Sequence, residues 1–187
     1  DFDFFYVKFN RNSQCLNLEN NFFDEYPKGI INSLSLTCLL IKQNRLKKIE
    51  NHFFLLNSNF FIASFSQNHI SFIQPKSFSK LSSLINLDLS FNFIDNLDVT
   101  TFIGLYNLRS LNLSHNSINH IQKDLFQQLF SLKILDLSNN LVKYIEENSF
   151  FNLNSLKFLY MNQNQISVIA RSNQSLIGLK ELKYFQI

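Results

Sequence analysis

Residues 84–155 read, in three successive segments of equal length, LINLDLSFNFIDNLDVTTFIGLYN, LRSLNLSHNSINHIQKDLFQQLFS and LKILDLSNNLVKYIEENSFFNLNS. Leu84, Leu108 and Leu132 begin these segments 24 residues apart, and Leu156 begins a fourth. The segments agree at every position that we expect to be buried. A fixed period of this length indicates a solenoid in which each repeat forms one coil.

The composition supports one continuous core. Hydrophobic residues make up 45% of the 187 residues, and a count of 22 Phe is explained if one Phe per repeat fills the same position. The formal charge of +3 is too small to indicate nucleic-acid binding by itself. No apolar run approaches the ~18 residues of a membrane span, so we expect no membrane segment within this chain.

The shared pattern is L-x-x-L-x-L-x-x-N-x-L-x-x-L, followed by Phe and then Leu. It resembles the leucine-rich repeat in its 24-residue extracellular form, as found in Toll-like receptor and Slit-type ectodomains. The resemblance implies a β-rich α/β solenoid, a right-handed horseshoe with a parallel β-sheet on its concave face. Irregular or short helical segments are expected on the convex side. The alternating L-x-L portion independently predicts a half-buried strand in each repeat.

The repeats predict the organisation of the whole chain. Residues 1–12 are expected to form an N-terminal cap strand, because a solenoid needs its open end covered. Residues 182–187 look like the start of a further repeat, at which we expect the chain to be truncated. Between them we expect a degenerate first repeat and six further repeats, at residues 13–35, 36–59, 60–83, 84–107, 108–131, 132–155 and 156–181.

Two columns of the repeat are expected to be structural. An aromatic column on the return side should stack as a spine inside the coils: Phe54, Phe78, Phe102, Phe126 and Phe150. An amide column follows the strand, where the backbone loses its ladder partners and a buried amide can satisfy them. We interpret this column as a structural ladder rather than an amide binding site: Asn44, Asn68, Asn92, Asn116, Asn140 and Asn164.

Residues that point out from the strands or flank them are the candidates for ligand binding, because repeat proteins usually bind partners on the concave surface. Some are aromatic or aliphatic, and the alternatives to an interface are packing beneath a missing segment or a compositional bias towards Phe. The basic column at the strand entry fits an anionic patch or, alternatively, is a solvated edge. The candidates are Phe61, Ile62, Ile85, Asp88, Phe91, Arg109, Asn112, Lys133, Asp136, Lys157, Phe158 and Tyr160.

The sequence does not predict an enzyme. Asp88 and Asp136 are two strands apart, about 10 Å, but nothing suggests a pocket that would raise the pKa of either carboxyl. The four His residues lack metal-ligand spacing, so we expect no metal and no cofactor. Ser90, Ser114 and Ser138 share one position and are interpreted as surface polar residues rather than nucleophiles.

Cys15 and Cys38 occupy the same position in consecutive repeats, which would place their Cα atoms ~4.8 Å apart. We therefore expect a disulfide, the alternative being two free thiols. Asn112 and Asn173 begin N-x-S sequons and are candidate glycosylation sites. Together with the repeat type, these features favour an oxidising compartment: the extracellular space or cell surface, or a secreted protein.

The resemblance implies a non-catalytic recognition module that binds a protein or glycan ligand, or an anionic surface, through its concave face. Homodimerisation is compatible with this function. One alternative is a structural, matrix or adhesion protein that associates with itself. A second is an intracellular leucine-rich-repeat scaffold.

Overall fold

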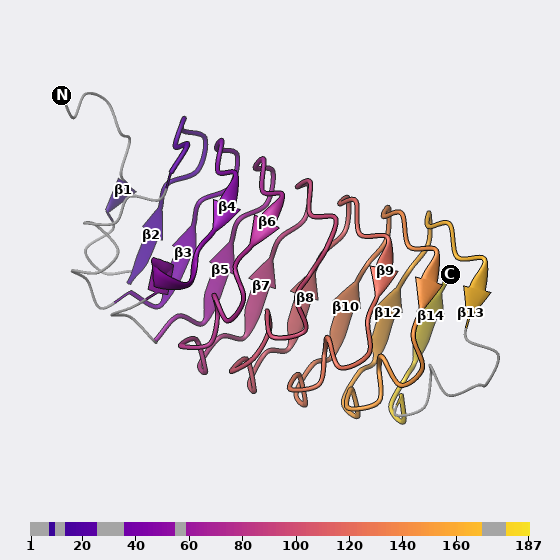
Figure 1. The fold of residues 1–187 in the computed structure, drawn as a ribbon. Helices are drawn as coiled ribbons and strands as arrows, with labels where there is room; N and C mark the ends of the chain where they lie inside the picture. The colour runs from indigo at the N-terminus through magenta and orange to yellow at the C-terminus, as the bar shows by residue number, and fades with distance from the viewer. Residues whose placement is uncertain (1–7, 10–13, 26–35, 55–58, 170–178) are drawn as a thin grey trace.

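The computed structural model describes residues 8–9, 14–25, 36–54, 59–169 and 179–187. Over these residues the chain winds into coils that stack in sequence order (Figure 1). Each coil contributes a short strand to one face and returns through turns on the opposite side. The only helix in this part of the chain is the 3-10 helix η1 (Asn51–Phe54). The molecule is therefore a parallel β-solenoid with almost no helix.

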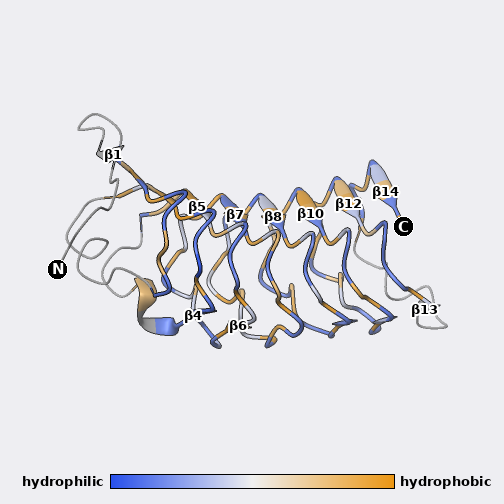
Figure 2. Cartoon of the chain, turned by 90° about the horizontal axis from the view of Figure 1, so that it is seen from above, coloured by the Kyte–Doolittle hydropathy of each residue, from blue (hydrophilic) through white to orange (hydrophobic). Residues whose placement is uncertain are grey.

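A nine-stranded sheet forms one face of the solenoid. β1 pairs antiparallel with β2, and the remaining strands are parallel. The sheet lies on the inner side of a gentle curve (Figure 2), so its outer surface is the concave face. In spatial order the strands are β1 (Lys8–Phe9), β2 (Cys15–Asn17), β3 (Cys38–Leu40), β5 (Ile62–Ser64), β7 (Asn86–Asp88), β8 (Ser110–Asn112), β10 (Ile134–Asp136), β12 (Phe158–Tyr160) and β14 (Tyr184–Gln186).

Besides η1, the return side carries two smaller parallel sheets. One pairs β4 (Lys48–Ile49) with β6 (Phe72–Ile73). Residues 96–97, which occupy the corresponding position in the next coil, form no strand. The second sheet follows that coil and contains β9 (His120–Ile121), β11 (Tyr144–Ile145) and β13 (Val168–Ile169).

Inward leucines and a stack of phenylalanines fill the interior. The middle residue of each concave strand from β2 to β12 is buried, as Leu87 and Leu111 illustrate. The rings of Phe78 and Phe102 stack with centroids 6.3 Å apart. The same stack continues to Phe126 and Phe150, with centroid separations of 6.1 and 5.9 Å. Each ring thus packs against the equivalent ring of the next coil.

The buried asparagines join neighbouring coils. The Asn92 side chain accepts a hydrogen bond from the Ile70 N–H at 2.9 Å, and it donates to the carbonyls of Phe65, Leu89 and Ser90. The same set of bonds recurs at Asn68, Asn116, Asn140 and Asn164. These amides satisfy backbone groups at the turn that ends each strand.

The serine column is not a surface feature. Ser90, Ser114 and Ser138 are all buried, so the sequence interpretation was wrong on this point. Each hydroxyl donates to the side-chain oxygen two residues earlier; the bond from Ser90 Oγ to Asp88 Oδ1 measures 2.7 Å. Strand alternation alone predicts that the hydroxyl points to solvent, but the hydrogen bond to that acceptor holds it beneath the turn.

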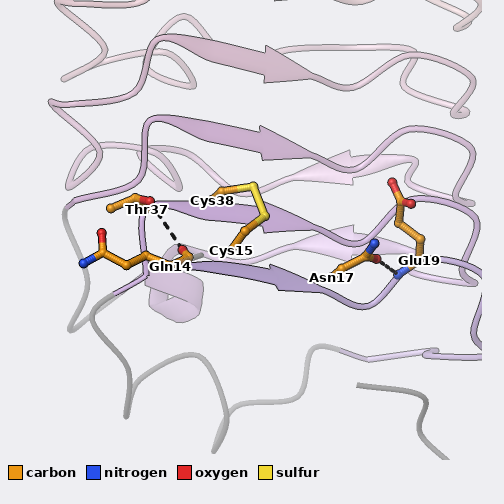
Figure 3. Close-up of a disulfide and its surroundings, with 6 residues drawn as sticks. All are labelled: Gln14, Cys15, Asn17, Glu19, Thr37 and Cys38. Atoms are coloured by element: carbon orange, nitrogen blue, oxygen red, sulfur yellow. Dashed lines mark hydrogen bonds between the residues drawn. A yellow bond between two sulfur atoms is a disulfide. The ribbon is translucent and has the colours of Figure 1, made fainter. Parts of the chain in front are cut away.

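Cys15 and Cys38 are joined by a disulfide (Figure 3). The two residues face each other across the parallel pair β2–β3, with Cα atoms 4.3 Å apart. The Thr37 N–H and hydroxyl both donate to the Gln14 carbonyl beside the disulfide. The disulfide therefore reinforces the backbone hydrogen bond that already joins the two coils.

Of the predicted cap, residues 1–12, only β1 lies within the described part of the chain. There its antiparallel pairing covers the outer edge of β2. Within the described residues, no helix has the length and apolarity needed to cross a membrane.

Candidate functional site

The outward residues of the concave strands form the candidate site. On each strand they flank an inward Leu or Ala, so consecutive strands align equivalent positions in rows. An open groove of about 520 Å³ runs across β5, β7, β8 and β10. Ile62 and Ile134 lie at its two ends, and its polar centre is formed by Ser64, Asp88 and Asn112. It therefore combines apolar ends with fixed hydrogen-bonding groups.

The acceptors in this row are held in place by the chain itself. Asp88 Oδ1 accepts from the Ser90 N–H at 3.0 Å and from the Ser90 hydroxyl. Asp136 Oδ1 accepts in the same way from the Ser138 hydroxyl and from the Ser138 N–H, the latter at 2.9 Å. The second oxygen of Asp88 accepts from Ser64 Oγ at 3.4 Å, so one polar connection already crosses two strands. Such preorganised acceptors suit the recognition of N–H and O–H donors.

A basic row borders the face at the strand entries. Backbone bonds from the Lys133 N–H to the Arg109 carbonyl and from the Lys157 N–H to the Lys133 carbonyl place these residues on adjacent coils. Lys183 continues the row in the same manner. Within the described residues, none of the four forms an ion pair. Their charges are free to act on a ligand.

Aromatic side chains dominate the C-terminal end of the face. Tyr160 and Tyr184, on the adjacent strands β12 and β14, have ring centroids 5.3 Å apart. Phe158 is half-buried beside them, directly paired with Tyr184 across the sheet. Aromatic rings that the core does not need are typical anchors of protein interfaces.

A second group of rings lies where the strands end, outside the groove. Phe91 is 48% exposed and stacks on His115 of the next coil. Phe93 is 58% exposed and contacts His69 of the preceding coil, with centroids 5.9 Å apart. We call Phe91, Phe93, His69 and His115 the rim cluster. The spacing of the histidines argues against a metal site, but it does not predict that two of them pack against Phe.

The structure brings together only part of the residue set that the sequence proposed. Asp88, Asn112 and Ile62 line one groove, and Asp136 lies on the next strand. Phe61 is exposed at the strand entry, whereas Ile85 is only partly exposed there. Asn86 and Ser110 also line the groove, although the sequence analysis did not select them. Their place in the Ile62 row was the signal that could have identified them.

Among the described residues, the two carboxylates and the histidines considered for chemistry are not brought together. The described residues contain no group of three or more His, Cys, Asp or Glu side chains that could hold a metal ion. Asp88 and Asp136 are separated by the whole strand β8, and each is oriented by its own serine. Of the two sequons, Asn112 lies at the centre of the concave groove, and Asn173 falls outside the described residues.

Comparison with known proteins agrees with this geometry. The leucine rich repeat family model matches residues 82–142, 107–166 and 130–187, which together cover more than half of the chain. No curated protein sequence matches it. Among the solved structures that do match is the crystal structure of a TLR13–ssRNA13 complex, 26% identical, with a TM-score of 0.62.

That match covers 79% of this chain and 24% of the TLR13 chain, so the chain spans about a quarter of its relative. The similarity extends from the repeat pattern to the path of the backbone. The chain resembles part of a Toll-like receptor ectodomain, and it belongs to the leucine-rich repeat family.

Proposed function

We propose that this chain is the recognition module of an extracellular or cell-surface protein and that it binds a protein ligand through its concave face. The observation that carries the proposal is the groove across β5, β7, β8 and β10, which has apolar ends and two acceptors, Asp88 and Asn112, held in place by Ser90 and Ser114. A rigid surface of this kind loses little conformational entropy on binding.

Each part of the face has a role in this proposal. The aromatic group Phe158, Tyr160 and Tyr184 supplies apolar contact area near the C-terminal end. The basic row from Arg109 to Lys183 accelerates encounter with an acidic partner and sets its orientation. Asp88 and Asp136 then select partners that present N–H or O–H donors to the centre of the face.

Single-stranded RNA is a second candidate ligand, because TLR13 is seen in complex with ssRNA13 and the basic row could contact phosphates. The carboxylates of Asp88 and Asp136 argue against it, since a polyanion crossing the centre of the face would meet both. A glycan ligand is compatible with the Tyr160–Tyr184 pair and the polar row. We place a protein ligand first because the apolar ends of the groove can pack against apolar side chains of a protein but not against a phosphate backbone.

Paired variants test the site. The wild-type protein and the variant Y160A/Y184A would be immobilised and exposed to the same pool of secreted and cell-surface proteins. We expect a protein that the wild type retains to be lost from Y160A/Y184A and kept by the control F130A/F151A, which removes exposed rings from the return side. Equal retention by both double variants would refute the role of the Tyr160–Tyr184 pair in ligand binding.

RNA and compartment are tested separately. Binding of a single-stranded RNA oligonucleotide that weakens steeply with salt and disappears in K133A/K157A would favour the second candidate. Intact mass of the protein secreted from eukaryotic cells, before and after deglycosylation and reduction, tests the extracellular assignment. We expect glycan on Asn173 or Asn112 and a Cys15–Cys38 disulfide; an unmodified chain with two free thiols would favour the intracellular scaffold.

A further inference from the structure

The return side of the solenoid is interrupted at one coil. On this side, the coil that begins at residue 60 is joined to the coil that begins at residue 36 by two backbone hydrogen bonds. They run from the Ser71 N–H to the Lys47 carbonyl and from the Gln74 N–H to the Ile49 carbonyl. The coils that begin at residues 108 and 132 are joined by the equivalent bonds, which the backbone N–H groups of Lys143 and Glu146 donate. Among the described residues, the 84–107 coil makes neither bond with either neighbour, which is why β6 and β9 belong to different sheets.

Two residues account for a missing contact between the 84–107 coil and the preceding one. In regular coils a long side chain reaches back to an N–H of the preceding coil: Gln74 Oε1 accepts from Asn51, and Glu146 Oε2 accepts from Lys123. The 84–107 coil has the shorter Asp98 at this position, and the N–H that it would need is missing because residue 75 is proline. Asp98 Oδ1 instead accepts from the N–H and hydroxyl of Thr100 in its own turn.

A buried hydroxyl without a hydrogen-bond partner lies at the same interruption. Ser77 and Ser149 donate from equivalent positions to the carbonyls of Ile49 and Ile121 in the preceding coil. Thr101 is their counterpart, and its hydroxyl is buried without a hydrogen-bond partner among the described residues. The contact that Ser77 and Ser149 make with the preceding coil is therefore absent here.

A groove of about 520 Å³ opens at the interruption. Phe72, which is 53% exposed, lines it together with Ile73, Pro75 and Val99. The carbonyls of Ser71 and Ile73 border it, and among the described residues they receive no backbone N–H from the next coil. Strand β6 therefore presents an open edge beside an apolar wall, which is the arrangement used in strand addition by extended peptides.

The charged side chains that line the groove are all acidic. Its lining contains the carboxylates of Asp95 and Asp98 and no Lys or Arg. Asp98 is held by Thr100, and its pKa lies below the ordinary value, chiefly because of these hydrogen bonds and with a smaller contribution from Lys76. The groove thus stays anionic although the chain as a whole is basic.

We propose that this groove binds an extended segment of a partner protein in which a Lys or Arg side chain lies next to an apolar one. The backbone N–H groups of the segment donate to the Ser71 and Ile73 carbonyls, the apolar side chain packs on Phe72, and the cation meets Asp95 and Asp98. The site is on the opposite side of the coil from the concave groove, so it serves a second partner and does not depend on the first.

A displayed library of random heptapeptides tests the proposal. We expect selection on the wild-type protein to enrich sequences with Lys or Arg beside an aliphatic or aromatic residue. Affinity for the enriched peptides should fall about tenfold or more in D95N/D98N, because charge-assisted bonds are replaced by neutral ones. Asn keeps the shape of Asp and can still accept from Thr100, so the fold should be retained; a single cooperative thermal unfolding transition verifies this.

The matched control is D88N/D136N, which removes the same charge from the concave face and should leave affinity for these peptides unchanged. A second variant, F72A, should weaken binding without altering net charge. The proposal is overturned if no sequence is enriched above the empty support, if the enriched peptides are acidic, or if D88N/D136N weakens binding as much as D95N/D98N does.

Discussion

Phe91 stacks face to face on His115, with ring centroids 4.0 Å apart and ring planes 10° apart. The contact forms although the Phe91 backbone has φ = 53°, in the left-handed region. Equivalent positions in other coils adopt a similar φ but hold polar residues, of which Asn and His tolerate it better than Phe. These are Asn20, Gln43, Gln67, His115, Asn139 and Gln163. An exposed Phe kept in an unfavourable conformation makes the rim cluster a candidate contact surface.

Replacing Phe91 by Asn should separate backbone strain from ring stacking. In an H115A background, where no stack remains, we expect F91N to raise the free energy of unfolding by about 1 kcal/mol, because Asn tolerates the left-handed region. In the wild-type background the gain should be smaller, since the lost stack offsets part of it. Urea unfolding of the four proteins measures both values. Equal gains in the two backgrounds would show that the stack contributes nothing.

Loss of one buried amide should destabilise the solenoid strongly. N92A removes an acceptor for the Ile70 N–H and a donor for three carbonyls, all buried. We expect the free energy of unfolding to fall by about 3 kcal/mol, since buried groups are left unsatisfied. Chemical denaturation measures the change, and N86A on the exposed side of β7 is the control. A loss below about 1 kcal/mol would contradict the role assigned to the ladder.

Truncating the aromatic stack should have a comparable effect. F126A opens a cavity between Phe102 and Phe150 and should lower the free energy of unfolding by about 3–5 kcal/mol. Phe130 is 48% exposed on the same coil, so F130A should change it by about 0.5 kcal/mol or less. Thermal unfolding of the two variants would refute the stack if their midpoints shifted equally.

Removing the disulfide should affect the N-terminal coils selectively. The bridge links residues 23 positions apart, and closing a loop of this length is worth about 3 kcal/mol. We expect hydrogen exchange in C15A/C38A to accelerate at the amides of β2 and β3. Exchange at β10 and β12 should remain close to the wild-type rate, because each coil contacts only its neighbours. Uniform acceleration along the chain would argue against this local role.

The acid response of Asp98 follows from its turn. Hydrogen bonds from Thr100 lower the pKa of the Asp98 carboxyl. The stabilisation from this group is therefore present above the ordinary pKa of Asp and is lost as the pH falls through the lowered folded-state pKa. T100V keeps the backbone N–H but removes the hydroxyl, so the pKa should rise towards its ordinary value. Titration of the Asp98 carboxyl by NMR measures it, and an unchanged pKa would exclude the hydroxyl as the main cause.

The sequence predicted the parts of the fold that repeat in every coil. Inward Leu, the Phe column and the Asn column recur at a fixed spacing because each satisfies the same need in each coil, such as the bonds made by Asn92 and Asn116. Periodicity reveals such residues directly. It also placed Cys15 opposite Cys38, since position in the repeat determines register in the sheet.

What the sequence did not predict depends on contacts that are local or irregular. Strand alternation pointed Ser90 outward, but the Asp88 carboxylate holds its hydroxyl in the turn. The return strands are two residues long, too short to show a period. In the 84–107 coil, the side-chain contact of Asp98 with the preceding coil is lost because Pro75 has no N–H, an effect that appears only once the neighbouring coil is in place.

The most direct test of concave-face recognition is site-specific photo-crosslinking. A photoreactive amino acid would replace Tyr160 in one protein and Asn152, on the return side, in another. With cell-surface and secreted proteins as the ligand pool, we expect a discrete crosslinked product from position 160 and none from position 152. Crosslinking at position 152 alone, or equally at both positions, would contradict the assignment of the concave face as the binding site.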